Sequence, residues 1–161
     1  MPNAIAMYSR SAEWILISIP CTIIIAYLPL IARYFGVSRM GKLWDNANPR
    51  LYIASLENEA LSGNYLALLP LRAHAAHLNS IEDLAIFVPA CIASFLFSQV
   101  DKLAIICAAI HMGLRCIYLL IYIFNSSPGF SYVRTLVWFL AWACPMIMLF
   151  EAAHQVGWPG P

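Results

Sequence analysis

Long apolar segments alternate with short polar ones along this chain, and their lengths predict helices that cross a membrane. A helix needs about 20 mostly apolar residues to span a bilayer core. Four windows meet this requirement, at residues 14–35, 71–98, 103–124 and 132–153. The pattern therefore predicts an all-α fold in which four transmembrane helices form a single domain over residues 1–161.

The composition agrees with a membrane environment. Of the 161 residues, 62% are hydrophobic and 11% are charged, whereas soluble domains carry about 25% charged residues. The net charge of +1 gives no reason to expect a nucleic-acid partner. All five cysteines fall inside apolar segments, which favours a packing role over a disulfide framework. We therefore expect a multi-pass integral membrane protein that contacts the lipid bilayer.

The distribution of basic residues predicts the orientation of the chain. Lysine and arginine cluster at the one long polar connection, residues 36–66, which also holds a turn-rich run at 44–50. Because connections rich in lysine and arginine stay in the cytoplasm, we expect this one to be cytoplasmic and both termini to be non-cytoplasmic. In a eukaryotic cell the expected host membrane is the endoplasmic reticulum.

This orientation brings the polar groups of three segments to the same leaflet. The segment at 71–98 starts at the cytoplasmic side, the segment at 103–124 ends there, and the segment at 132–153 starts there. A charged side chain inside hydrocarbon costs about 2.5–3.5 kcal/mol or more, so such residues usually face a protein interior or a wet cavity. The pattern therefore predicts one water-accessible hollow that faces the cytosol.

Helical spacing groups the candidate chemistry, because residues three and four apart share a face of a helix. Arg72, Asn79 and either Glu82 or Asp83 form one such stripe. The third and fourth segments add further polar and aromatic groups at the same depth, namely Arg115, Tyr118, Tyr122, Arg134, Thr135 and Trp138.

Simpler structural roles for these residues stay open. The charged stripe could hold the bundle together through interhelical pairs such as Glu82 with Arg115, and the tyrosines could form an aromatic belt at the headgroups. His74 and His77 resemble half of a carboxylate–histidine metal site. Because no further ligands stand at obvious positions, we expect no metal.

The order and spacing of these residues resemble the MAPEG family, the membrane-associated proteins of eicosanoid and glutathione metabolism. The resemblance covers nearly the whole chain and looks closest to the microbial-type branch. It rests on four motifs in order: Asn48-Pro49-Arg50, Arg72 with His77-Leu78-Asn79 and Glu82, Arg115 with Tyr118 and Tyr122, and Arg134-Thr135.

The resemblance implies a homotrimer that binds glutathione between neighbouring subunits in the cytoplasmic leaflet. It implies that Glu82 meets the amino group of the peptide and that Arg134 stabilises a thiolate. The implied catalytic residues are Arg134, Tyr122 and Glu82. The implied glutathione-binding residues are Arg72, Asn79, Glu82, Arg115, Tyr118 and Tyr122. The candidate contacts to a lipophilic small-molecule substrate are His77, Thr135 and Trp138.

The sequence departs from the characterised glutathione users at identifiable positions. Ala75 and Leu78 stand where those proteins have arginines, so two donors for a carboxylate are absent. Trp138 stands where a tyrosine is often found. The candidates to replace the missing donors are Arg39, Lys42, Arg50 and Arg72.

Three functions remain compatible with the sequence. The first is a glutathione-dependent transferase, peroxidase or isomerase that acts on a lipophilic electrophile. The second is a glutathione-independent isomerase or cyclase of a hydrophobic metabolite, which the missing arginines favour. The third is a non-catalytic membrane scaffold, in which the polar cluster only holds helices together.

Overall fold

The structure is a computed structural model of the chain, and it describes residues 3–97, 102–125 and 127–157. These residues form helices joined by connections, without a strand. The elements are α1 (Asn3–Arg39), α2 (Pro49–Leu61), the short 3-10 helix η1 (Tyr65–Ala67), α3 (Leu68–Phe97), α4 (Lys102–Phe124) and α5 (Pro128–Gln155). The all-α fold predicted from the apolar pattern is therefore confirmed.

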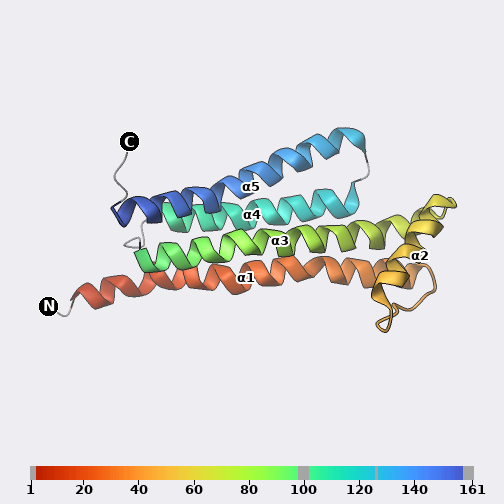
Figure 1. The fold of residues 1–161 in the computed structure, drawn as a ribbon, viewed down its shortest axis with the longest axis horizontal. Coiled ribbons are helices and arrows are strands. Elements are labelled where there is room, and N and C mark those ends of the chain that lie inside the picture. The colour runs from red at the N-terminus through yellow and green to blue at the C-terminus, as the bar shows by residue number, and fades with distance from the viewer. Residues whose placement is uncertain (1–2, 98–101, 126, 158–161) are drawn as a thin grey trace.

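Four helical stretches of the described residues are long and apolar enough to cross a membrane. They cover Glu13–Arg39, Tyr65–Phe97, Lys102–Phe124 and Gly129–Gln155. In the bundle, α1 packs along α3, and α4 packs along α5 (Figure 1). The predicted windows fall within these helices, apart from residue 98, which lies outside the described residues.

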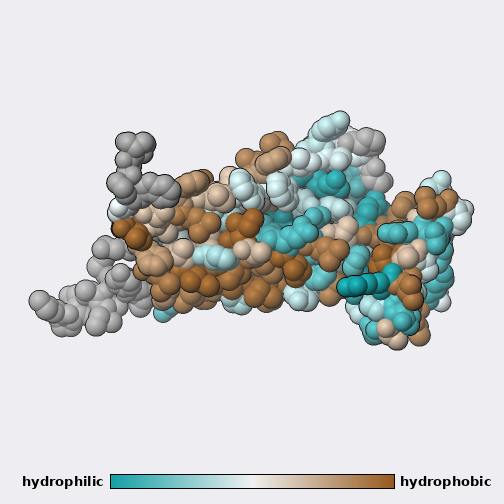
Figure 2. Space-filling view, viewed as in Figure 1, coloured by the Kyte–Doolittle hydropathy of each residue, from teal (hydrophilic) through white to brown (hydrophobic). Residues whose placement is uncertain are grey.

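The two ends of the bundle differ in polarity. Helix α2 lies at one end, which we call the α2 end, whereas α1 begins and α5 ends at the opposite end (Figure 1). Figure 2 shows hydrophilic side chains gathered toward the α2 end and hydrophobic side chains covering much of the other half. The polar chemistry of the molecule is therefore concentrated at the α2 end.

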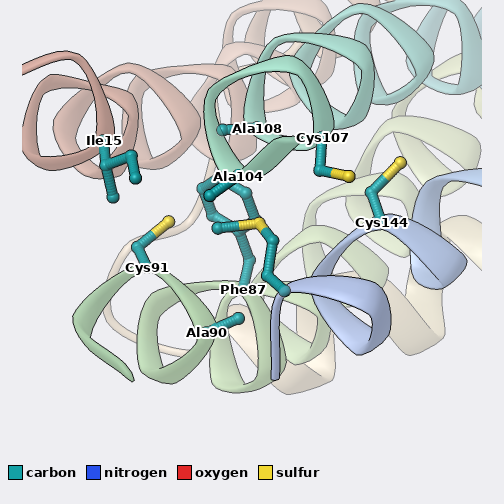
Figure 3. Close-up of a cluster of buried hydrophobic side chains, with 9 residues drawn as sticks. Ile15, Phe87, Ala90, Cys91, Ala104, Cys107, Ala108 and Cys144 are labelled. Carbon is teal, nitrogen blue, oxygen red and sulfur yellow. The ribbon is translucent and has the colours of Figure 1, made fainter. Parts of the chain in front are cut away.

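The half of the bundle away from α2 is held by small and sulfur-containing side chains (Figure 3). Cys107 of α4 and Cys144 of α5 lie close together there, and the described cysteines are free thiols. Helix association in lipid relies on close van der Waals packing, which small residues allow. The buried residues of this cluster are Ile15, Phe87, Ala90, Cys91, Ala104, Cys107, Ala108, Cys144 and Met148.

Helices α1 and α3 approach each other closely where Gly36 faces Pro70. A Cβ added at Gly36 would lie 2.7 Å from the Pro70 Cδ and 3.1 Å from the Pro70 nitrogen. A real Cβ cannot sit that near to backbone and ring atoms, so a glycine at this position permits the contact. The approach fixes where the chain leaves α1 and enters α3 at the α2 end.

The connection between α1 and α3 is a folded cap rather than a turn-rich loop. Proline in the first turn of α2, after Asn48, suits a helix start, since the first helical N–H groups need no intrahelical partner. Leu56 of α2 is fully buried against Val37 and Ala67. We call residues 40–67 the α2 cap. The turn residues in the sequence do not reveal this helix, because its apolar face is short.

An ion pair closes the α2 cap on its exposed side, between Lys42 and Glu59. The Lys42 ammonium donates a hydrogen bond to the Glu59 carboxylate and thereby lowers the pKa of that carboxyl. Nearby, burial of the Tyr52 ring against Trp44 raises the pKa of the Tyr52 hydroxyl. The apolar cluster around Leu56 and the Lys42–Glu59 ion pair therefore stabilise the α2 cap.

A buried ionic cluster joins α3, α4 and α5 within the membrane-spanning part. The Asp83 Oδ2 lies 3.0 Å from the His111 Nε2 and 3.3 Å from the Arg115 Nε. The Arg115 Nη2 also donates to the Asn79 carbonyl at 3.2 Å and the Ser80 Oγ at 3.1 Å. Because His111 is 0% and Arg115 1% exposed, both side chains are withdrawn from lipid.

Two further contacts hold the His111 ring in place. Its Nδ1 donates to the Ala141 carbonyl of α5 at 2.9 Å, which fixes a proton on that nitrogen. The Phe87 ring stacks on it with centroids 4.1 Å apart. The expected pair of Glu82 with Arg115 is wrong, because Asp83 occupies the buried face of α3 and Glu82, one residue earlier, is exposed.

Replacing Asp83 with alanine should strongly destabilise the bundle. The change leaves Arg115 buried without its carboxylate, and breaking a buried pair costs about 3–5 kcal/mol. The free energy of unfolding, measured by reversible denaturation in detergent micelles, should fall by that amount. The exposed carboxylate of Glu57 is the control, and Glu57→Ala should change it by less than about 0.5 kcal/mol. Equal effects of the two substitutions would contradict the role of the cluster.

Acidification should loosen the α2 cap before it affects the bundle. The folded pKa of Glu59 is lowered, so its contribution to stability is present above the unfolded pKa, roughly 4.3, and is lost as pH falls through the folded value. Hydrogen exchange of the α2 amides should accelerate in that range. In Lys42→Gln the acceleration attributable to Glu59 should disappear, whereas Glu57→Gln should retain it.

Candidate functional site

Among the hollows at the α2 end, two are lined by the same two arginines. The first, which we call the loop hollow, has a volume of about 270 Å³ and lies beside the α4–α5 connection. The second, the α2 hollow, has a volume of about 540 Å³ and lies between α2, α3, α4 and α5. Arg72 of α3 and Arg134 of α5 belong to both linings.

The Arg72 and Arg134 guanidinium groups have no carboxylate partner among the described residues. The Nε and Nη1 of Arg72 are buried without a hydrogen-bond partner. Within the described part of the chain, the Nη2 of Arg134 donates to the Ser131 Oγ, at 3.3 Å. A guanidinium offers a planar fork of donors that matches a carboxylate. The pair can therefore hold an anion between the two hollows.

Tyr122 places an aromatic ring against Arg134. The Arg134 Cζ lies 4.4 Å from the centroid of the Tyr122 ring, a cation–π arrangement that orients the guanidinium. The same tyrosine lines the α2 hollow. Three of the residues expected from the sequence, Arg72, Tyr122 and Arg134, thus meet at one place.

Other expected residues lie inside the bundle rather than at the hollows. Arg115 belongs to the buried ionic cluster, and Tyr118 packs under its guanidinium with 4.7 Å between the Arg115 Cζ and the ring centroid. Asn79 is half-buried, and its backbone carbonyl accepts a hydrogen bond from Arg115. These three side chains are absent from the linings of both hollows.

The remaining expected residues are distributed over other faces. Glu82 is exposed on its membrane-spanning helix and lines neither hollow. The His77 Nδ1 donates to the Ala26 carbonyl of α1 at 2.8 Å. The hydroxyl of Thr135 donates to the Ser131 carbonyl at 3.0 Å. Trp138 packs edge-on against Phe139.

The expectation of one shared hollow is therefore wrong in part. The polar groups divide into the buried cluster around Asp83 and the open pair of Arg72 and Arg134. The physical reason is the placement of the acids, since Asp83 is close enough to neutralise Arg115. No described carboxylate lies that close to the other two arginines.

Two polar residues of the α2 hollow were not expected at the site from the sequence. Glu57 enters from α2, and His74 enters from α3. His74 follows helical spacing with other lining residues, since Leu71, His74, Ala75 and Leu78 are three or four apart. That periodicity was readable in the sequence. The approach of α2 was not, because it depends on how the cap folds back.

Comparison with known proteins places the chain in a family. The model of the MAPEG family matches residues 17–154, which include the α2 cap and all or nearly all of each membrane-spanning stretch. Neither the curated proteins nor the solved structures compared with the chain give a match. Together with the four apolar helices, the family match identifies an integral, multi-pass membrane protein. The chain belongs to the MAPEG family.

Proposed function

We propose that the protein is a glutathione-dependent membrane enzyme acting on a lipophilic electrophile from the cytoplasmic leaflet, by transfer, peroxide reduction or isomerisation. One observation carries this proposal. Arg72 and Arg134 converge on the same hollows with no carboxylate partner among the described residues. Glutathione is an anionic peptide with two carboxylates, and membership of the MAPEG family supports it as the ligand.

Arg134 is the proposed catalytic residue because its charge can activate the thiol. A free thiol has a pKa near 8.5, so only a few per cent is ionised at neutral pH. A guanidinium within contact distance favours the thiolate, which is the nucleophile. In a transfer reaction the thiolate sulfur forms a bond to the electrophilic carbon of the co-substrate, while the bond from that carbon to its leaving group breaks and the leaving group departs with the electron pair. Tyr122 holds the Arg134 guanidinium from one side.

Arg72 is the proposed carboxylate-binding residue. Its Nε and Nη1 are buried and without a partner, and such donors gain a charge-assisted hydrogen bond when a carboxylate arrives. The apolar helices around the site give a lipophilic co-substrate access from the bilayer. In this arrangement the charged peptide binds at the α2 end, and the lipophilic co-substrate lies between the membrane-spanning helices.

The proposed role of Glu82 and Asn79 is to bind glutathione at a boundary between subunits. A charged group exposed on a membrane-spanning helix is costly in hydrocarbon, so a neighbouring copy would have to cover Glu82. A homotrimer provides such a neighbour and agrees with the family. In this arrangement Arg115 and Tyr118 fix the helix positions behind the site. The α2 end would face the cytoplasm, and both termini would lie on the opposite side.

A second function has an observation in its favour. Ala75 and Leu78 line the α2 hollow, where arginines would otherwise supply donors for a peptide carboxylate. That apolar wall suits a hydrophobic metabolite, for which Glu57 and Tyr122 would offer acid–base groups. An isomerase or cyclase that works without glutathione is therefore the alternative.

Glutathione should stabilise the protein against heat, because a ligand that binds only the folded state raises its stability. We expect the melting temperature to rise at millimolar glutathione. Arg72→Gln and Arg134→Gln should each weaken binding by about tenfold or more, since a hydrogen bond to a charged group contributes about 1.5–3 kcal/mol. Arg39→Gln, an arginine outside both hollows, should bind like the wild type. Unchanged melting of the wild type would favour the alternative function.

Arg134 should lower the pKa of the bound thiol. The ultraviolet absorbance of the thiolate, followed against pH in the glutathione complex, should show a midpoint below that of free glutathione. Arg134→Gln should raise this midpoint and Arg134→Lys should partly restore it, because lysine keeps the charge but not the fork. A midpoint equal to that of free glutathione in the wild type would exclude thiol activation by Arg134.

A further inference from the structure

A proline divides α5 into two parts that are packed differently. Pro145 has no backbone N–H group, so the carbonyl of Ala141, four residues earlier, loses its partner within the helix. In the described residues 129–140, which we call the α5 arm, the one buried residue is Val137. The buried residues of the part that follows are Ala141, Cys144, Pro145, Met148 and Ala152. The bundle therefore holds the arm less firmly than the rest of α5.

His111 of α4 occupies the carbonyl that Pro145 leaves free. The His111 Nδ1 donates a hydrogen bond to the Ala141 carbonyl at 2.9 Å. Prolines are tolerated in membrane-spanning helices where neighbouring groups satisfy the freed backbone. His111 and Pro145 are both fully buried, so this contact lies inside the bundle, where an unsatisfied carbonyl would cost free energy. His111 thus stabilises the break in α5.

A histidine also meets a proline break in α1. The His77 Nδ1 of α3 donates to the Ala26 carbonyl at 2.8 Å, three residues before Pro29. Helices kink where a proline or an inserted side chain interrupts their backbone hydrogen bonds. Pro29, like Pro145, is fully buried. Two separate places in the bundle therefore combine a buried proline with a histidine that binds a nearby carbonyl of the same helix.

The break turns the α5 arm away from the bundle. A proline opens the helix on the face that carries its ring, and the Pro145 ring is buried, so the arm bends outward. Figure 1 shows α5 diverging from α4 toward the α4–α5 connection. Arg134 lies seven residues before Ala141, which is about 10 Å along the helix. A kink of about 20° therefore displaces Arg134 by roughly 3–4 Å.

We propose that His111 is a positioning residue for Arg134 and acts through a hinge in α5 at Pro145. Its hydrogen bond to the freed carbonyl fixes the angle at which the α5 arm leaves the bundle. That angle sets where Arg134 meets the Tyr122 ring, whose centroid lies 4.4 Å from the Arg134 Cζ. The inference does not depend on the ligand that the hollows bind, because it concerns contacts within one chain.

The substitution Pro145→Ala tests the hinge directly, because it restores a backbone N–H group for the Ala141 carbonyl. Cryo-electron microscopy of the full-length protein in lipid nanodiscs compares wild type and variant. In the variant α5 should straighten, and Arg134 should move by roughly 3–4 Å relative to the Tyr122 ring. Pro20→Ala, which changes an exposed proline of α1, should leave α5 as it is. An α5 arm that keeps its direction in Pro145→Ala overturns the hinge.

A double-mutant cycle measures the contribution of His111 to the hinge. His111→Phe keeps a ring against Phe87 but loses both the donor and the contact with Asp83. In detergent micelles it should raise the equilibrium constant for unfolding about tenfold more in the wild type than in Pro145→Ala, where the Ala141 carbonyl keeps a partner within the helix. The loss of the Asp83 contact is common to both backgrounds and cancels.

Additive effects of the two substitutions overturn the role of His111. If His111→Phe alone does not fold, the double variant with Pro145→Ala should recover a folded protein, and a double variant that also fails to fold overturns the proposal. In the folded double variant Arg134 should occupy the position that it has in Pro145→Ala. An arm that instead returns to its wild-type direction contradicts positioning through the hinge.

Discussion

Hydrocarbon tolerates charge only where another group compensates it, and Asp83 provides that compensation in the middle of this bundle. Its carboxylate contacts His111 and Arg115 of α4, and His111 continues to a carbonyl of α5. Separately, His77 of α3 donates to a carbonyl of α1. Polar contacts of α3 therefore reach α1 and α4 directly, and they reach α5 through His111 of α4.

The candidate site contains the arginines that no described carboxylate neutralises. Asp83 pairs with His111 and Arg115 in the buried cluster, and no described carboxylate pairs with Arg72 or Arg134 at the α2 end. Unpaired guanidinium groups at the hydrated end of a bundle attract an anion, and the hollows beside them provide the room. The arginine that stabilises the bundle is therefore different from the arginines proposed to bind the ligand. The structural arginine is Arg115, and the proposed functional ones are Arg72 and Arg134.

The sequence allowed the helices to be predicted because long apolar windows leave few other structures in lipid. The choice between Glu82 and Asp83 was also readable. Asp83 continues a stripe of small residues, Ala76 and Ser80, at a spacing of three and four, and Glu82 does not.

The α2 cap and its hollow could not be predicted in the same way. Glu57 lies in the long connection, and nothing local indicates that α2 folds back beside Arg72 and Tyr122. That placement depends on burial of Leu56 and on the close approach of Gly36 to Pro70, which are contacts between distant residues. Tertiary packing, not local pattern, therefore decides which polar residues share the site.

The most direct test of this account is a cryo-electron microscopy structure of the protein in a lipid nanodisc with glutathione. The account predicts density for the peptide in the α2 hollow, with a carboxylate at Arg72 and the sulfur beside Arg134. It would be contradicted if Arg72 and Arg134 instead formed ion pairs with carboxylates of a neighbouring subunit, leaving no room for an anion. Glutathione bound at a distance from both arginines would contradict it equally.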